Sequence, residues 1–177
     1  MTTVEIEQML MHSMMERGFL VFAERINIAS SEYDVVGINK NDYVYEYEIK
    51  QSRADFKADF KKVSKHIKLE SRKAYRMVDI WKQGKRTGEQ YKQVLIPNRF
   101  FYVCNENMIK IEEIPEYAGL IYVKDGVFWE VKGAPLLHRE KAPVHTFKSI
   151  CITMCERGLL GCAKMTYLNN KIKHAAV

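Results

Sequence analysis

Two acidic residues and a lysine in the first third of the chain are spaced so that the acids could bind a metal ion beside the lysine. Glu48 and Lys50 lie two residues apart in residues 43–50, where polar and apolar side chains alternate, so in a strand they share one face. Asp34 lies in residues 33–39, which are rich in β-branched and aromatic side chains, and residues 40–42 are typical of a turn. The pattern predicts a β-hairpin with charged groups on one face.

The register of this hairpin decides whether Asp34 joins that face. If Asn39 pairs with Tyr43 across a three-residue loop, Asp34 lies directly opposite Glu48, with Cβ atoms about 4.5 to 5.5 Å apart. A two-residue loop would place Asp34 opposite Tyr47 on the other face, because one residue of slip inverts every side chain. The sequence leaves both registers open.

In the first register the three groups predict a site that cleaves phosphodiester bonds. Two close carboxylates raise each other's pKa unless a cation lies between them, and oxygen ligands completed by water suit Mg²⁺ or Mn²⁺. Such an ion polarises a phosphoryl oxygen and lowers the pKa of a bound water, while Lys50 would orient that water or stabilise negative charge. For Glu48 and Lys50 alone, the alternative is an ordinary solvated strand face.

The residues around the hairpin resemble the PD-(D/E)XK nuclease superfamily. That pattern is an Asp on one strand, then acid-x-Lys at the end of the next, followed by a helix; Asp34, Glu48 and Lys50 match it, with Tyr33 in place of the proline. Residues 48–59 (EIKQSRADFKAD) are also similar to the EVKSSRADFxxD signature of MmcB-like DNA-repair nucleases and related phage proteins. Residues 98–103 and 114–121 extend the resemblance, which covers residues 18–142.

The resemblance implies a restriction-endonuclease-like α/β core, a mixed central sheet flanked by helices, and specific roles. Asp34 and Glu48 would be metal ligands, Lys50 the catalytic amine, and the backbone carbonyl of Ile49 a further ligand. An acid on the first strand or helix often assists the metal in these families, and Glu24 is the nearest match. The alternative for Glu24 is an ion pair with Arg25 or a lysine.

Basic residues dominate the segment that follows Lys50. We expect a helix with Ser52 as its N-cap, on which a stripe of cations recurs every three or four residues, while Phe56, Phe60, Val63 and Ile67 form the buried face. The stripe would contact a nucleic-acid backbone, and a solvated face is the alternative. The stripe consists of Lys57, Lys61, Lys65, Lys68 and Arg72, and Ser52 and Arg53 are further candidates for contact with nucleic acid. Residues 81–90 form a glycine-punctuated loop in which Lys82, Lys85 and Arg86 are further candidates for phosphate contacts.

Composition bounds the remaining questions. The 177 residues predict one domain, with a helical extension from about residue 143, and the net charge of +6 favours a polyanion such as DNA. Neither a long apolar run nor a signal-peptide pattern occurs, so we expect a cytoplasmic protein without membrane contact. Cys104, Cys151, Cys155 and Cys162 lack the spacing of a disulfide framework, so we expect reduced core thiols; an iron–sulfur cluster is the alternative.

These observations predict a Mg²⁺- or Mn²⁺-dependent deoxyribonuclease, most simply an endonuclease in DNA repair, recombination or phage DNA processing. Two other functions use the same fold. A DNA-binding module would keep the basic stripe without activity, and a regulatory protein would bind another protein instead of DNA. The sequence does not choose between a monomer and a homodimer.

Overall fold

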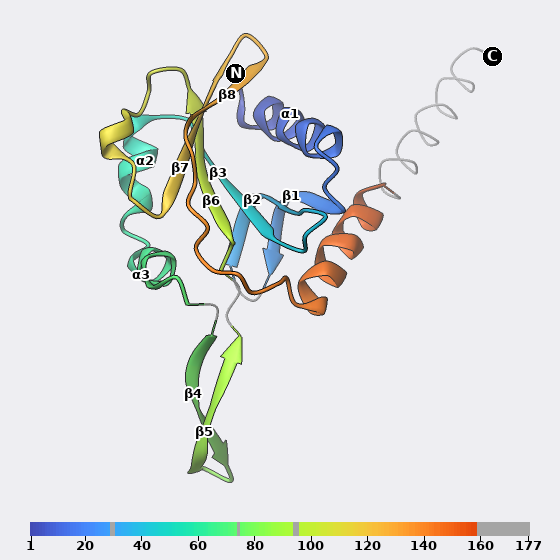
Figure 1. The fold of residues 1–177 in the computed structure, drawn as a ribbon, viewed down its shortest axis with the longest axis vertical. Coiled ribbons are helices and arrows are strands. Elements are labelled where there is room, and N and C mark those ends of the chain that lie inside the picture. The colour runs from blue at the N-terminus through green and yellow to red at the C-terminus, as the bar shows by residue number, and fades with distance from the viewer. Residues whose placement is uncertain (29–30, 74, 94–95, 159–177) are drawn as a thin grey trace, which may run out of the picture.

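A six-stranded mixed sheet forms the centre of the computed structural model, which describes residues 1–28, 31–73, 75–93 and 96–158 (Figure 1). Its strands run in the order β1-β2-β3-β6-β7-β8, where β3–β6 and β6–β7 are parallel and the other pairs antiparallel. The strands are β1 (Val21–Ile28), β2 (Ser31–Ile38), β3 (Val44–Lys50), β6 (Arg99–Asn105), β7 (Ala118–Lys124) and β8 (Val127–Lys132). The predicted α/β class with a mixed, helix-flanked sheet is confirmed.

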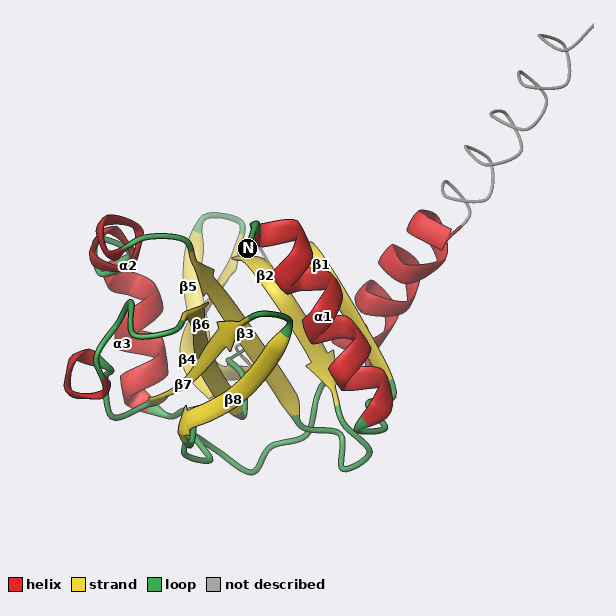
Figure 2. Cartoon of the chain, turned by 90° about the horizontal axis from the view of Figure 1, so that it is seen from above, coloured by secondary structure: helices red, strands yellow, loops and turns green. Residues whose placement is uncertain are grey.

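Helices cover both faces of this sheet (Figure 2). On one face, α1 (Thr3–Glu16) packs Ile6 and Leu10 against a core that includes Tyr47. On the other, α2 (Arg53–Asp59) and α3 (Val63–Ser71) pack against Tyr102 of β6. Because successive strand residues point to opposite faces, the even-numbered residues of β3 point toward α2 and α3. The short helix η1 (Ile111–Glu113) lies between β6 and β7.

The β2–β3 hairpin adopts the three-residue loop. The Asn39 amide donates to the Tyr43 carbonyl at 3.0 Å, and the ladder pairs Val36 with Glu46 and Val35 with Tyr47. Asp42 in the loop has a φ of 63°, the left-handed conformation that such loops place at their last position. This is the register that sets Asp34 opposite Glu48.

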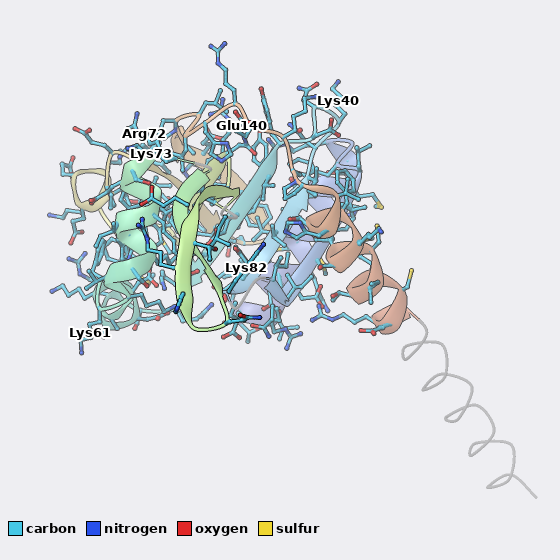
Figure 3. All side chains as sticks on the ribbon, turned by 90° about the horizontal axis from the view of Figure 1, so that it is seen from below. Lys40, Lys61, Arg72, Lys73, Lys82 and Glu140 are labelled. Carbon is cyan, nitrogen blue, oxygen red and sulfur yellow. The ribbon has the colours of Figure 1, made fainter. Side chains whose placement is uncertain are left out.

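The single helix expected after Ser52 is wrong, because the chain turns between α2 and α3. Ser52 does cap α2, since its Oγ accepts from the Asp55 amide at 3.1 Å. His66 Nε2 lies 2.9 Å from the Asp59 carbonyl and fixes the corner. The turn changes the helical phase, so Phe60, Val63 and Ile67 are exposed although a buried face was predicted for them. Figure 3 shows Lys61 and Arg72 at opposite ends of this layer.

The loop expected at residues 81–90 is also wrong. Strands β4 (Tyr75–Lys82) and β5 (Lys85–Gln93) pair with each other in a separate two-stranded sheet, which extends away from the rest of the molecule (Figure 1). The two turn residues, Gln83 and Gly84, have φ values of 48° and 75°, as a tight hairpin of the type I′ class requires. We call residues 75–93 the arm.

A helix over residues 144–158 follows the last strand and agrees with the predicted extension; residues 159–177 lie outside the described range. Its Ile150 packs against β1 and β2. Cys104 is buried as predicted, but Cys151 and Cys155 are exposed on this helix, so the expectation of core thiols is wrong for these two; Cys162 lies outside the described residues. No helix in the described ranges is both long and apolar enough to span a membrane.

Candidate active site

Asp34 lies where β2 separates from β3. The recorded ladder ends at the pair Val35–Tyr47, and beyond it the Ile49 amide donates to Asp34 Oδ2 at 2.8 Å instead of to a strand carbonyl. A strand residue directs its N–H and its C=O to the same edge, so the Ile49 carbonyl also points toward the side of Asp34. Thus Asp34 and the Ile49 carbonyl lie at the same gap in the sheet.

Glu48 and Lys50 lie on the face of β3 that is covered by α2 and α3. Lys50 Nζ is 2.8 Å from Glu48 Oε1, and the two residues are only 3% and 4% exposed. Burial and the neighbouring charge of Glu48 raise the pKa of Asp34 to about 6. Burial also opposes ionisation of Glu48, but Lys65 and Lys50 outweigh it and hold the pKa of Glu48 below its ordinary value. The structure therefore brings together the three residues predicted to be catalytic.

Asp59 is a fourth member that the sequence pattern did not single out. Its side chain is buried, Lys50 Nζ and Lys62 Nζ each lie 3.2 Å from Oδ1, and the Tyr102 hydroxyl donates to Oδ2 at 2.9 Å. Burial would raise the pKa of Asp59, but Lys65 and Lys50 outweigh it and lower the pKa well below the usual range. The available signal was its place as the last acid of residues 48–59.

Two lysines close the cluster from the side of α3. Lys65 Nζ lies 2.7 Å from Glu48 Oε2 and 3.6 Å from Glu46 Oε1, and Lys62 Nζ lies 3.5 Å from Glu48 Oε1. The Lys62 side chain is 60% exposed, whereas that of Lys65 is 21% exposed. Lys65 was predicted to lie on a surface stripe, but its ammonium contacts buried carboxylates; its contact with DNA stays a prediction. Movement of Lys62 and Lys65 would open Glu48 to solvent.

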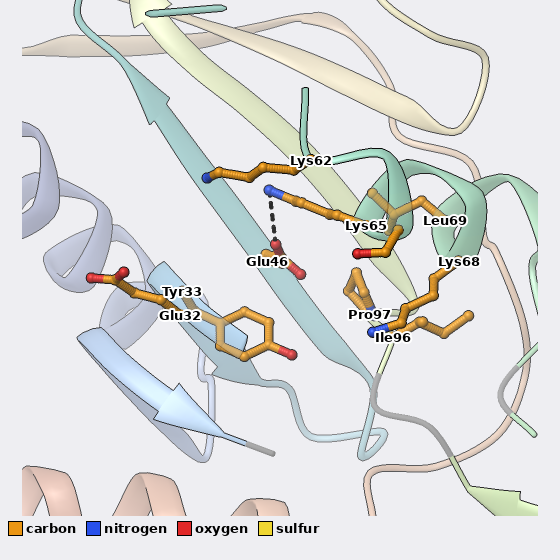
Figure 4. Close-up of a pocket in the computed structure, with 10 residues that line it drawn as sticks. Glu32, Tyr33, Glu46, Lys62, Lys65, Lys68, Leu69, Ile96 and Pro97 are labelled. Carbon is orange, nitrogen blue, oxygen red and sulfur yellow. Dashed lines mark ion pairs between the residues drawn. The ribbon is translucent and has the colours of Figure 1, made fainter. Parts of the chain in front are cut away.

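A cavity of about 320 Å³ adjoins the cluster (Figure 4). It shares Lys62 and Lys65 with the cluster, and Glu46 lies at its wall, where burial raises the Glu46 pKa to about 7 against the opposing effect of Lys65. Tyr33, from β2, and Lys68, from α3, line other sides. The cavity provides space beside Glu48 for part of a substrate.

Glu24 does not join the cluster, which corrects the expectation of a third carboxylate ligand. It pairs with Val35 across the β1–β2 ladder and so shares the face of Val35, which packs with α1. Its Oε1 lies 2.7 Å from the Arg157 guanidinium. Glu24 thus forms an ion pair, as the alternative predicted, but its partner is Arg157 and not Arg25 or a lysine. The opposite strand face explains why Glu24 cannot reach Asp34 and Glu48.

The remaining donors fit a hard cation that keeps part of its water. Within the described ranges, no group of three or more His, Cys, Asp or Glu side chains is arranged to hold a metal. Two carboxylates, Asp34 and Glu48, and the Ile49 carbonyl suffice for Mg²⁺ or Mn²⁺, which commonly complete their coordination with water and substrate phosphate. Because Lys65 and Lys50 occupy the oxygens of Glu48, cation binding requires that Glu48 release Lys65.

This geometry predicts that Mn²⁺ binding depends on Glu48 and not on Glu24. We expect Glu48→Gln to weaken Mn²⁺ binding at least tenfold. Loss of a residue that only hydrogen-bonds to a metal ligand typically lowers metal affinity by about 10- to 100-fold, and loss of a charged ligand itself costs more. Glu24→Gln is the matched control, with the same chemical change on the opposite face of the sheet, and should bind Mn²⁺ as the wild type does. Titration calorimetry measures both; equal losses would place the metal elsewhere.

The other residues predicted to contact nucleic acid are dispersed. Ser52 caps α2, and Arg53 donates to both carboxylate oxygens of Glu113 and to the Met108 carbonyl. Lys57 and Lys61 are exposed near α2, Lys68 lines the cavity, and Arg72 is exposed as the C-cap of α3. Lys82, Lys85 and Arg86 lie at the tip of the arm. The stripe is therefore interrupted, because α2 and α3 do not form one helix.

Comparisons with known proteins bear on the fold. No protein-family model and no curated protein matches this chain. Among solved structures, a protein of unknown function from Silicibacter pomeroyi superposes with a TM-score of 0.54 and 20% sequence identity, over 81% of this chain and 80% of its own. At that identity, the likeness shows that the two chains share a fold.

Proposed function

We propose that this protein is a metal-dependent nuclease with a restriction-endonuclease-like core of the PD-(D/E)XK type, which hydrolyses DNA in the cytoplasm. The observation that carries the proposal is that Asp34, from β2, lies close to Glu48 and Lys50, from β3, where the two strands separate. This requires the three-residue hairpin loop, and either a one-residue slip or a different strand pairing would have separated the groups.

In this function Asp34, Glu48 and the Ile49 carbonyl would hold Mg²⁺ or Mn²⁺. When bound, the cation stabilises charge on the phosphoryl oxygens and provides a water of lowered pKa. Lys50 is held between Glu48 and Asp59, so its ammonium has a fixed position beside the ligands, from which it can orient the attacking water or stabilise the developing charge. Asp59 is a positioning residue, because it acts through Lys50.

Lys62 and Lys65 supply the means to admit a polyanion. Each contacts carboxylates of the cluster and also lines the adjoining cavity. A DNA phosphate arriving there offers both ammoniums an alternative partner, which frees Glu48 for the cation. Charge neutrality is thereby maintained while lysine–carboxylate pairs are exchanged for lysine–phosphate pairs.

The direct test is cleavage of DNA with and without the cation. We expect the purified protein at low salt to nick supercoiled circular DNA in Mg²⁺ or Mn²⁺ and to leave it intact in EDTA. Linear and branched DNA, run in parallel, distinguish an endonuclease from an enzyme that needs an end. Absence of products from every substrate with both metals would contradict the proposal.

A DNA-binding module without catalysis is the second candidate, and the closed state of the cluster favours it. Both oxygens of Glu48 are within 2.8 Å of a lysine ammonium, so the charge of Glu48 is already neutralised by lysines. Such a module would bind DNA equally well in Mn²⁺ and in EDTA, and it would show no Mn²⁺ binding that depends on Glu48. The two candidates therefore differ in metal affinity as well as in cleavage.

A further inference from the structure

The arm is a separate two-stranded sheet that projects from the body between α3 and β6 (Figure 1). Within the part of the chain that the structure describes, β4 and β5 pair only with each other. A strand of nine residues is about 30 Å long at roughly 3.3 Å per residue. An isolated two-stranded hairpin is only marginally stable in water. Contact with the surface of a bound partner would therefore stabilise an arm of this length.

The charge of the arm indicates an anionic partner. Residues 75–93 contain five Lys and Arg residues against two acids. At the tip, Lys82, Lys85 and Arg86 are exposed; Arg86 pairs with Glu89, while among the described residues Lys82 and Lys85 form no ion pair. Two uncompensated ammoniums at the end of a projecting ribbon are suited to phosphates on both sides of a groove.

The root of the arm lies beside the candidate active site. The arm begins shortly after α3, which supplies Lys65 and Lys68, and the chain returns to the body through Ile96 and Pro97. These four residues all line the cavity that adjoins Glu48 (Figure 4). A polyanion held by the arm is therefore close to the catalytic cluster. Exposed Arg72 and Lys73, labelled in Figure 3, connect α3 to the start of the arm in the chain.

We propose that the arm enters the major groove of B-form DNA, so that the substrate of this protein is a DNA duplex. The major groove of B-DNA is about 12 Å wide and admits a two-stranded ribbon, whereas the major groove of A-form RNA is too deep and narrow for side chains to read. Single strands offer no groove. The inference rests on the proposed function only where it concerns cleavage; DNA binding by the arm is independent of it.

The test compares three ligands in EDTA, where no cleavage can occur. We expect Lys82→Ala/Lys85→Ala to lower affinity for a 20-base-pair DNA duplex by about tenfold at 0.1 M salt, measured by fluorescence anisotropy. The slope of log K against log salt should fall by about 2, since each lost phosphate contact removes roughly 0.9. Affinity for an RNA duplex and a single DNA strand of the same sequence should change little.

Lys40→Ala/Lys148→Ala is the matched control, because both lysines are exposed on other elements and the charge lost is the same. Equal losses for all three ligands, or no loss for the DNA duplex, would overturn insertion into the groove. The proposed function fails separately: a wild type that binds duplex DNA through the arm but never cleaves it contradicts catalysis and supports the arm. A protein that cleaves DNA, but whose affinity for duplex DNA is unchanged by the arm substitutions, supports the proposed function and contradicts the role of the arm.

Discussion

Lys50→Met is expected to lower the rate of metal-dependent DNA cleavage by about 10² to 10⁴-fold, the range typical for loss of a positioned proton-transfer or charge-stabilising group. Lys50 Nζ lies 2.8 Å from Glu48 and 3.2 Å from Asp59, so its ammonium is held in place beside the candidate metal ligands. Methionine keeps the volume of the lysine stem at a position that is 3% exposed. The measurement is the initial rate of nicking of circular DNA in Mn²⁺.

Lys57→Met is the matched control for this substitution, because Lys57 is exposed on α2 and undergoes the same chemical change. Its cleavage rate should stay within about threefold of wild type, as expected when a single exposed phosphate contact is removed. Duplex affinity in EDTA should be retained by both variants, which separates chemistry from binding. Unchanged cleavage by Lys50→Met would remove Lys50 from the reaction.

The hairpin could be predicted from the sequence because its signals are local. Alternation in residues 43–50 and the polar turn at residues 40–42 indicate two paired strands. The choice of register was open, and the structure decides it through Asn39, whose side-chain oxygen accepts from the Asn41 and Tyr43 amides. Local turn chemistry at Asn39 thus fixes the position of Asp34, which lies five residues earlier in the chain.

The break between α2 and α3 could not be predicted, because its causes are distant in sequence. The basic and apolar spacing continues through residues 60–62 as if one helix ran on. The corner is instead fixed by Asp59 and His66. Asp59 accepts a hydrogen bond from the Tyr102 hydroxyl, and His66 is hydrogen-bonded to the Tyr117 hydroxyl. Both tyrosines come after the arm in the sequence. Tertiary contacts of this kind override helical periodicity, since propensity is only a weak preference.

The assignment of individual charges failed for the same reason. Spacing alone does not distinguish a lysine that faces solvent from one that neutralises a buried acid, so Lys65 was placed on a surface stripe. Glu24 was misplaced because its face depends on the β1–β2 pairing, which the sequence does not specify. Glu48 and Lys50 were correctly placed side by side, because alternation along a single strand fixes their common face.

Asp59→Asn is expected to reduce the free energy of unfolding by about 3 to 5 kcal/mol at neutral pH, the usual cost of removing one partner from a buried ion pair. An amide cannot balance the ammonium of Lys50, whose other close carboxylate, Glu48, is shared with Lys62 and Lys65. The loss is a large part of the 5 to 15 kcal/mol typical of a domain. Urea unfolding followed by circular dichroism measures it.

The pH dependence tests the cause of this loss. Burial opposes ionisation of Asp59, but Lys65 and Lys50 lower its pKa below the unfolded value, so its stabilisation is present above about pH 4 and is lost as the pH falls further. The difference between wild type and Asp59→Asn should therefore shrink on acidification below pH 4. Asp125→Asn, in the exposed β7–β8 turn at a φ of 49° that Asn tolerates, should change stability by less than about 0.5 kcal/mol. A difference that persisted at low pH would show that Asp59 stabilises the fold by packing and not by its charge, and Lys50 would then lack the electrostatic anchor on which its catalytic position depends.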